Sequence, residues 1–139
     1  MTVPVLLGAV LGGLFAFAVS TRGPRGEMRV LAYGLVVAAL IYPAWLLALA
    51  ATDWLTLELG GVLVFAVLGW FGVRTSPWWL VLGWVGHVGW DAWFHLDRES
   101  VIPSWYPLLC VGFDLAVAGF LLGQLLGRER VAGLSRSVG

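Results

Sequence analysis

Five apolar stretches occupy most of this chain, and each is close to the ~20 residues that an α-helix needs to cross a ~30 Å hydrocarbon layer. They are Val3–Ser20, Val30–Ala51, Leu55–Val73, Pro77–Leu96 and Tyr106–Gly127. Lipid offers the backbone no hydrogen-bond partners, so such stretches fold as helices. Only 12% of the residues are charged, against about a quarter in soluble domains. The sequence therefore predicts an all-α, polytopic membrane helical bundle with five transmembrane helices, forming one domain over residues 1–139.

The arginines predict how this bundle is oriented. Arginine accounts for all eight basic residues, and only Arg98 lies in the second or fourth connection, together with Asp53, Asp97 and Glu99. The others lie in the first and third connections and after the last span: Arg22, Arg25, Arg29, Arg74, Arg128, Arg130 and Arg136. Positively charged connections stay in the cytoplasm. We therefore expect a plasma-membrane protein with its N-terminus outside and residues 128–139 as a cytoplasmic tail.

The fourth apolar stretch carries His87, Asp91 and His95 at successive steps of four residues. On a helix each such step turns by about 40° and rises by about 6 Å, so the three side chains form one polar stripe. A charged residue in hydrocarbon costs about 2.5–3.5 kcal/mol on insertion scales. The stripe is therefore expected to face other helices or a wet cavity.

Two further carboxylates are expected near this stripe. Helix direction places Glu58 about one turn below the outer boundary and Asp114 about 12 Å below it. All five ionisable residues would then lie in the outer half of the membrane or at its floor. We expect an outward-facing polar pocket formed chiefly by the third, fourth and fifth spans. Tyr42, Trp90 and Tyr106 are candidates to line it.

Each residue also has a simpler explanation. A carboxylate in the first turn of a helix, such as Glu58, is stabilised by the helix dipole, and His95 would suit the interface beside Asp97. Tyr106 is better explained as an interfacial anchor than as the roof of a pocket. Asp91 and Asp114 are surrounded by apolar sequence, and intramembrane ionisable residues of this kind generally have a function.

Two imidazoles and two or three carboxylates are the usual ligand set for zinc or another divalent metal, and His87, Asp91 and Asp114 are the first candidates for metal ligands. His95 and Glu58 are additional candidates. A site for a lipid-soluble ligand has the same pattern. Two alternatives remain: a non-catalytic structural or accessory subunit whose polar residues join helices, and a small proton-coupled transporter, which would need to oligomerise.

Several cofactors and partners are disfavoured. The absence of lysine excludes a retinal Schiff base, and His87 and His95 lie on one helix and cannot ligate a haem from opposite sides. No basic surface stretch suits nucleic acid. The expected partner is the lipid bilayer. Glycines at spacings of four predict close helix packing within the bundle, with a homo-oligomer contact as the alternative: Gly8 and Gly12, and Gly119, Gly123 and Gly127.

The segments GHVGWDAWFH and VIPSWYPLLCVGFD resemble a group of small bacterial integral-membrane proteins of unknown function. In that group a helix with His-x3-Asp precedes a Trp-Tyr-Pro start and a last helix that carries Asp. The resemblance covers residues 77–123, about a third of the chain. It implies a role for His87, Asp91, Tyr106 and Asp114 but no activity. A looser similarity to multi-helix membrane metallohydrolases carries no catalytic roles, because this chain has too few helices and histidines.

Overall fold

The computed structural model describes residues 2–96 and 102–137, and over these residues the fold is entirely helical. Asp97, Arg98 and Glu99 of the fourth connection lie outside the described residues. Four of the five helices are long and apolar enough to cross a membrane, whereas α4 has 17 residues and falls just short of that length. The helices are α1 (Thr2–Ser20), α2 (Pro24–Ala48), α3 (Leu55–Arg74), α4 (Trp78–Phe94) and α5 (Trp105–Ser137).

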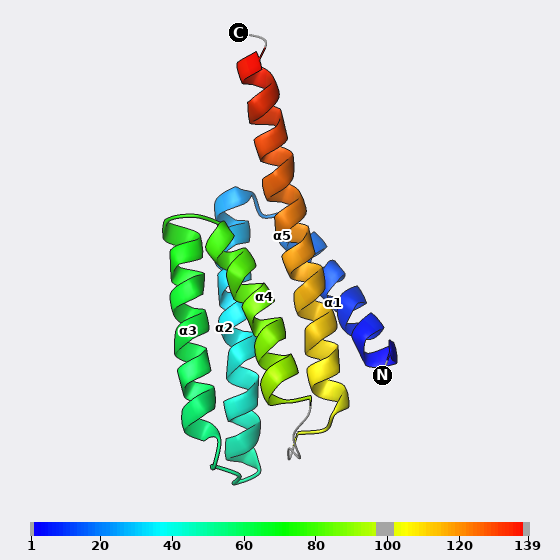
Figure 1. The fold of residues 1–139 in the computed structure, drawn as a ribbon, viewed down its shortest axis with the longest axis vertical. Helices are drawn as coiled ribbons and strands as arrows, with labels where there is room; N and C mark the ends of the chain where they lie inside the picture. The colour runs from blue at the N-terminus through cyan, green and yellow to red at the C-terminus, as the bar shows by residue number, and fades with distance from the viewer. Residues whose placement is uncertain (1, 97–101, 138–139) are drawn as a thin grey trace.

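Two helix boundaries differ from the prediction by more than three residues, and α4 ends at Phe94, one residue before His95. Helix α2 begins at Pro24 and not at Val30, because Gly23 adopts a positive φ of 73° and Pro24 suits the first position of a helix. Helix α5 continues to Ser137, through the segment predicted to be a cytoplasmic tail, and extends beyond the bundle (Figure 1). Apolarity ends near Gly127, but the residues that follow include no proline and favour helix.

The helices run alternately up and down in two closely packed pairs, with α4 between them (Figure 1). Helix α1 packs along α5, α2 packs along α3, and α4 contacts both α3 and α5. As a result α1, α3 and α5 finish at the same end of the bundle, where α2 and α4 begin. We call this the arginine end, because Arg25, Arg74 and Arg128 lie there, and the opposite one the histidine end.

Glycine explains how α1 approaches α5. A Cβ added at Gly8 would collide with the backbone oxygen of Leu109, and one added at Gly112 would collide with that of Val5. The two backbones are therefore in direct contact, as small residues permit in membrane bundles. The prediction of close packing is wrong for Gly119, Gly123 and Gly127, where an added Cβ would meet no atom of the described structure within 4 Å.

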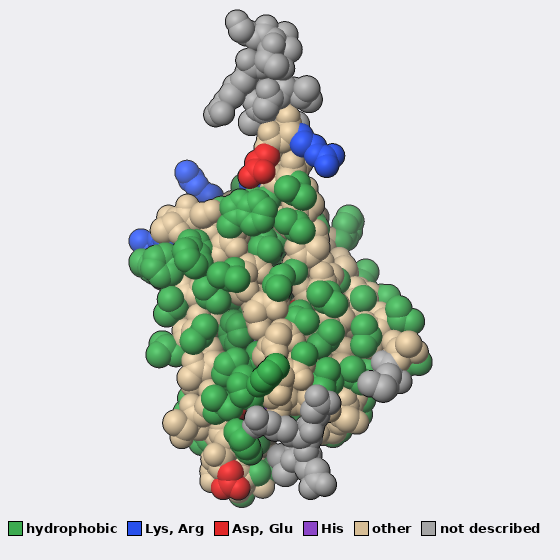
Figure 2. Space-filling model, viewed as in Figure 1, with side chains coloured by type: hydrophobic (Ala, Val, Ile, Leu, Met, Phe, Trp, Pro, Cys, Tyr) green, Lys and Arg blue, Asp and Glu red, His purple; other side chains and the backbone are tan. Residues whose placement is uncertain are grey.

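The distribution of side chains is the reverse of that in a soluble protein. Large apolar side chains cover the surface (Figure 2), among them Trp93, Val3 and Phe17 with exposed fractions of 76%, 74% and 71%. The buried side chains include six that can ionise: Glu27, Glu58, His87, Asp91, His95 and Asp114. Charged residues are seldom buried in water-soluble proteins, so this arrangement is consistent with a membrane protein.

Candidate functional site

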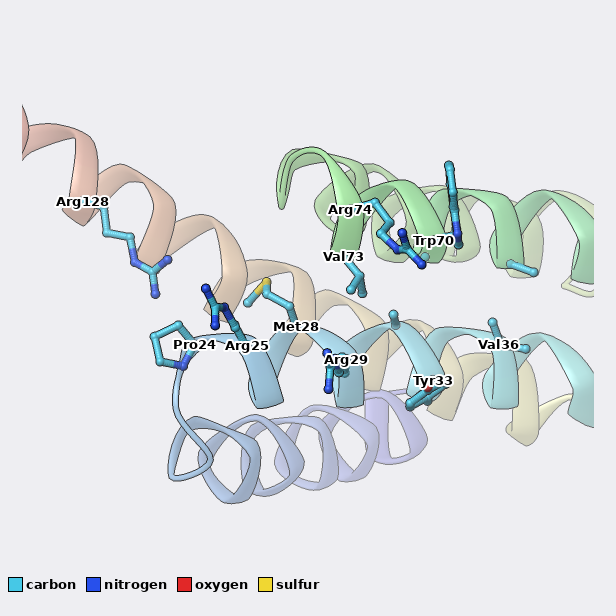
Figure 3. A pocket seen from close by; sticks show the side chains of 13 residues that line it. Pro24, Arg25, Met28, Arg29, Tyr33, Val36, Trp70, Val73, Arg74 and Arg128 are labelled. Atoms are coloured by element: carbon cyan, nitrogen blue, oxygen red, sulfur yellow. The ribbon is translucent and has the colours of Figure 1, made fainter.

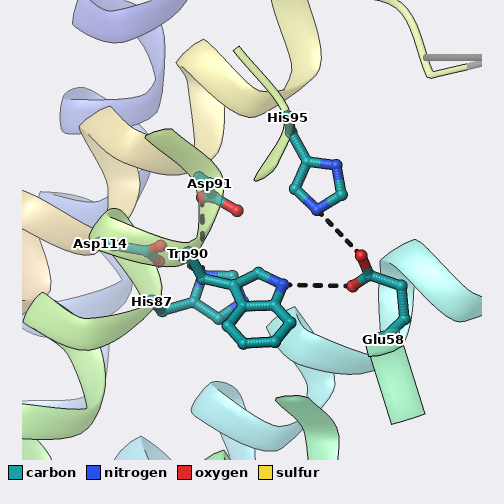
Figure 4. A network of polar contacts seen from close by, with 6 residues as sticks. All are labelled: Glu58, His87, Trp90, Asp91, His95 and Asp114. Carbon is teal, nitrogen blue, oxygen red and sulfur yellow. Dashed lines mark hydrogen bonds and ion pairs between the residues drawn. The ribbon is translucent and has the colours of Figure 1, made fainter. Parts of the chain in front are cut away.

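The side chains of His87, Asp91 and Asp114 meet at the interface between α4 and α5 (Figure 4). Nδ1 of His87 lies 2.8 Å from Oδ2 of Asp114 and 3.6 Å from Oδ2 of Asp91. The three side chains are 0–1% exposed, and one ligand atom from each lies within 4.8 Å of the others. We call these residues the His–Asp triad. Their expected proximity is thus found, and it depends on the packing of two helices.

The triad satisfies only part of its own hydrogen-bonding capacity. Within the described part of the chain, neither carboxylate oxygen of Asp91 has a hydrogen-bond partner, nor does Nε2 of His87. A buried carboxylate that accepts no hydrogen bond is costly, because it loses its hydration and gains only the neighbouring imidazole of His87 at 3.6 Å in exchange. Asp91 is therefore the strongest indication that the triad holds a further group, either a proton or a cation.

Glu58 and His95 form a second cluster towards the histidine end. Nε2 of His95 lies 3.3 Å from Oε1 of Glu58, within ion-pair distance although without hydrogen-bond geometry. The indole Nε1 of Trp90 donates a hydrogen bond of 3.3 Å to Oε2 of Glu58. Glu58 thus contacts Trp90 of α4 and His95, the residue that directly follows α4. It also lies in the first turn of α3, where the helix dipole stabilises a carboxylate.

Aromatic rings lie between the His–Asp triad and the Glu58–His95 cluster and contact residues of both. The ring of Tyr42, from α2, stacks on His95 with 3.8 Å between centroids and an interplanar angle of 1°. Its hydroxyl interacts with Asp91, although no partner among the described residues stands in full hydrogen-bond geometry. Tyr106 packs edge-on against Tyr42 at 5.8 Å, and Phe65 lies 4.9 Å from His87. Tyr42 therefore contributes to both clusters, and Tyr106 covers it from α5.

Side chains fill the space that was expected to form an outward-facing pocket. A hollow remains beside His87, between Tyr42, Glu58, Phe65 and Trp90, but it has no room for a water molecule. Gly61 allows this dense packing, because a Cβ there would lie 2.8 Å from the ring of Trp90. Neither aspartate of the triad lines this hollow, and it has no room for an organic molecule.

Comparison with protein-family models, with curated protein sequences and with solved structures finds no match to this chain. The resemblance to small bacterial membrane proteins remains a prediction from the two motifs alone.

Glu27 is a buried ionisable residue that the sequence analysis did not single out. It lies in the first turn of α2 with an exposed fraction of 4%, and its Oε1 has no hydrogen-bond partner among the described residues. Its spacing with the buried residues Leu31 and Leu35 is that of one helix face. This signal was missed because the helix was expected to begin only at Val30.

Proposed function

We propose that the protein is a small integral protein of the plasma membrane whose His–Asp triad binds a divalent metal ion such as zinc. The observation that carries this proposal is the convergence of three fully buried ligand groups from two helices, with ligand atoms within 4.8 Å of one another. Intramembrane ionisable residues that face the bundle interior commonly mark functional sites.

Charge favours a divalent cation. With the imidazole neutral, as metal ligation requires, the two carboxylates would give the site a net charge of minus two, and no arginine side chain interacts with them in the described structure. Burying uncompensated charge is strongly unfavourable. A divalent cation would neutralise the site without any further residue.

Size and donor type also favour a metal over a lipid-soluble ligand. The hollow beside His87 cannot admit a water molecule, so a larger ligand would require side chains to move. Zinc bonds of ~2.0–2.1 Å in a tetrahedron place neighbouring ligand atoms about 3.3 Å apart, and the distances from His87 Nδ1 to the two aspartates, 2.8 and 3.6 Å, lie on either side of that value.

The triad offers three ligand atoms, one each from His87, Asp91 and Asp114. Structural zinc sites are closed by four protein ligands, whereas catalytic zinc sites combine three protein ligands with a position open for water. The ligand number of the triad therefore matches the open kind of site. If the site opens to substrate, the metal would supply Lewis acidity.

For the membrane topology we propose five crossings, with the N-terminus outside and the arginine end in the cytoplasm. The 17 residues of α4 extend about 26 Å at 1.5 Å per residue, which is close to the thickness of the hydrocarbon layer. The clustering of arginines at one end of the bundle supports the orientation. The two histidine-containing clusters would then lie in the outer half of the membrane or at its floor.

A second candidate is a metal-free structural role within an accessory subunit. The hydrogen bond of 2.8 Å between His87 and Asp114 joins α4 to α5 and would stabilise the bundle by itself. In this case a proton shared within the triad would take the place of the metal. The same residues are involved, so metal content is the property that separates the two candidates.

The deciding experiment is elemental analysis of the detergent-purified protein by plasma mass spectrometry. Near-stoichiometric metal is expected in wild type, and most of it should be lost in Asp91→Asn and Asp114→Asn. Glu58→Gln is the matched control, because it also removes a buried carboxylate but lies outside the triad. Folded wild type that remains free of metal after incubation with zinc would contradict the proposal.

Thermal unfolding with and without a chelator then distinguishes a metal from a helix-joining pair. A ligand bound only to the folded state raises its stability. Chelation should therefore lower the melting temperature of wild type and of Glu58→Gln, and it should have no effect on Asp114→Asn. If Asp114→Asn is destabilised while the chelator leaves wild type unchanged, the structural role is supported.

A further inference from the structure

A second site lies at the arginine end, on the opposite side of the membrane from the His–Asp triad in the proposed topology. It is a groove of about 850 Å³ between α2 and α3, with α5 at its rim (Figure 3). This volume is within the range of small-molecule sites. The groove shares no residue with the triad or with the second cluster, so it requires a separate explanation.

Four arginines from three helices line this groove: Arg25 and Arg29 from α2, Arg74 from α3, and Arg128 from α5. All four are exposed, and no ion pair joins any of them to a carboxylate of the described residues. The lining contains no acidic side chain. The guanidinium group carries donors in a planar fork that suits phosphate oxygens. The groove therefore presents an uncompensated cationic mouth.

The positive potential of the groove comes from the arginines and not from the start of α2. Pro24 and Arg25 occupy the first turn of the helix and both line the groove, but Glu27 places a buried carboxylate in the same turn. A carboxylate there offsets the positive end of the helix dipole.

The interior of the groove is apolar. Small residues, Ala32 on α2 and Ala66 and Gly69 on α3, leave room between the two helices. Further apolar surface comes from Met28, Val36, Val73 and the rings of Tyr33 and Trp70. From Arg25 to Val36 the groove follows α2 for about 16 Å at 1.5 Å per residue. One leaflet accounts for half of a ~30 Å hydrocarbon layer, so the groove matches the depth of a single leaflet.

We propose that this groove binds one anionic phospholipid of the leaflet at the arginine end. The phosphate lies among the four arginines, and an acyl chain lies along the apolar surface between α2 and α3. Basic pockets between transmembrane helices bind lipid headgroups in this manner. A soluble phosphate would explain the arginines but not the apolar extension.

The test is lipid binding by the full-length protein in detergent, measured by native mass spectrometry. Phosphatidylglycerol is compared with phosphatidylcholine of the same acyl chains, and soluble glycerol phosphate is the third ligand. Wild type is expected to prefer phosphatidylglycerol by at least about tenfold and to bind glycerol phosphate far more weakly, because each arginine near the headgroups contributes to binding. Equal binding of the two lipids would overturn the proposal. Glycerol phosphate binding as tightly as the lipid would assign the groove to a soluble anion and would also overturn it.

Two variants test the location of the site. Arg25→Gln with Arg74→Gln should weaken phosphatidylglycerol binding at least about tenfold, whereas Arg22→Gln with Arg130→Gln changes the net charge equally outside the groove and should preserve it. Ala66→Phe fills the apolar part without changing charge and should also weaken binding. An equal loss in the Arg22/Arg130 control would indicate diffuse attraction and refute a defined site. Unchanged melting temperatures verify that each variant is folded.

Discussion

The rings of Tyr42 and His95 lie face to face, 3.8 Å apart and parallel within 1°, although α2 and α4 are separated by a whole helix in the chain. Tyr42 is also buried against Tyr106, and its hydroxyl is near Asp91. It is therefore the residue through which the two polar clusters contact each other.

Tyr42→Phe should change the free energy of unfolding by less than about 0.5 kcal/mol, because the hydroxyl has no partner in full hydrogen-bond geometry among the described residues. Tyr42→Ala should cost about 3–5 kcal/mol, since it removes a buried ring that packs on two others. Reversible unfolding in detergent measures both. A loss above about 1 kcal/mol in Tyr42→Phe would show that the hydroxyl bonds to a group at the site.

Gly8→Ala should destabilise the bundle by about 1–3 kcal/mol, because the new methyl group would collide with the backbone oxygen of Leu109 and push α1 away from α5. Gly123→Ala is the matched control. It meets no described atom within 4 Å and should be neutral, or stabilising by up to about 1 kcal/mol through its helix propensity. Equal destabilisation by both substitutions, measured by thermal unfolding, would show that Gly123 also lies in a contact.

The proposed topology predicts the accessibility of single cysteines in a Cys110→Ser background. Asp53→Cys and Ser104→Cys lie at the histidine end and should react with a membrane-impermeant maleimide in intact cells. Thr21→Cys and Thr75→Cys lie at the arginine end and should react only after permeabilisation. Thr75 and Ser104 flank α4, so identical labelling of these two positions would show that α4 does not cross the membrane.

The number of helices and their approximate extents could be predicted from the sequence, because the length of an apolar run is a local property. The stripe on α4 could be predicted for the same reason, since a spacing of four residues places side chains on one helix face. The gathering of arginines at one end follows from the alternating directions of the helices. The start of α2 and the end of α5 were misplaced by more than three residues, because a proline at the first position of α2 and helix-compatible polar residues in α5 extend these helices beyond the apolar run.

The packing of the helices sets which ionisable residues pair. The spacing of four residues places His87, Asp91 and His95 on one side of α4 and its C-terminal end, but this side contacts α5 at the level of His87 and α3 at the level of His95. His87 therefore meets Asp114, and His95 meets Glu58. Packing also decided that Gly112 and not Gly123 contacts α1, and that side chains fill the expected pocket. These outcomes depend on the relative positions of whole helices, which no single stretch of sequence encodes.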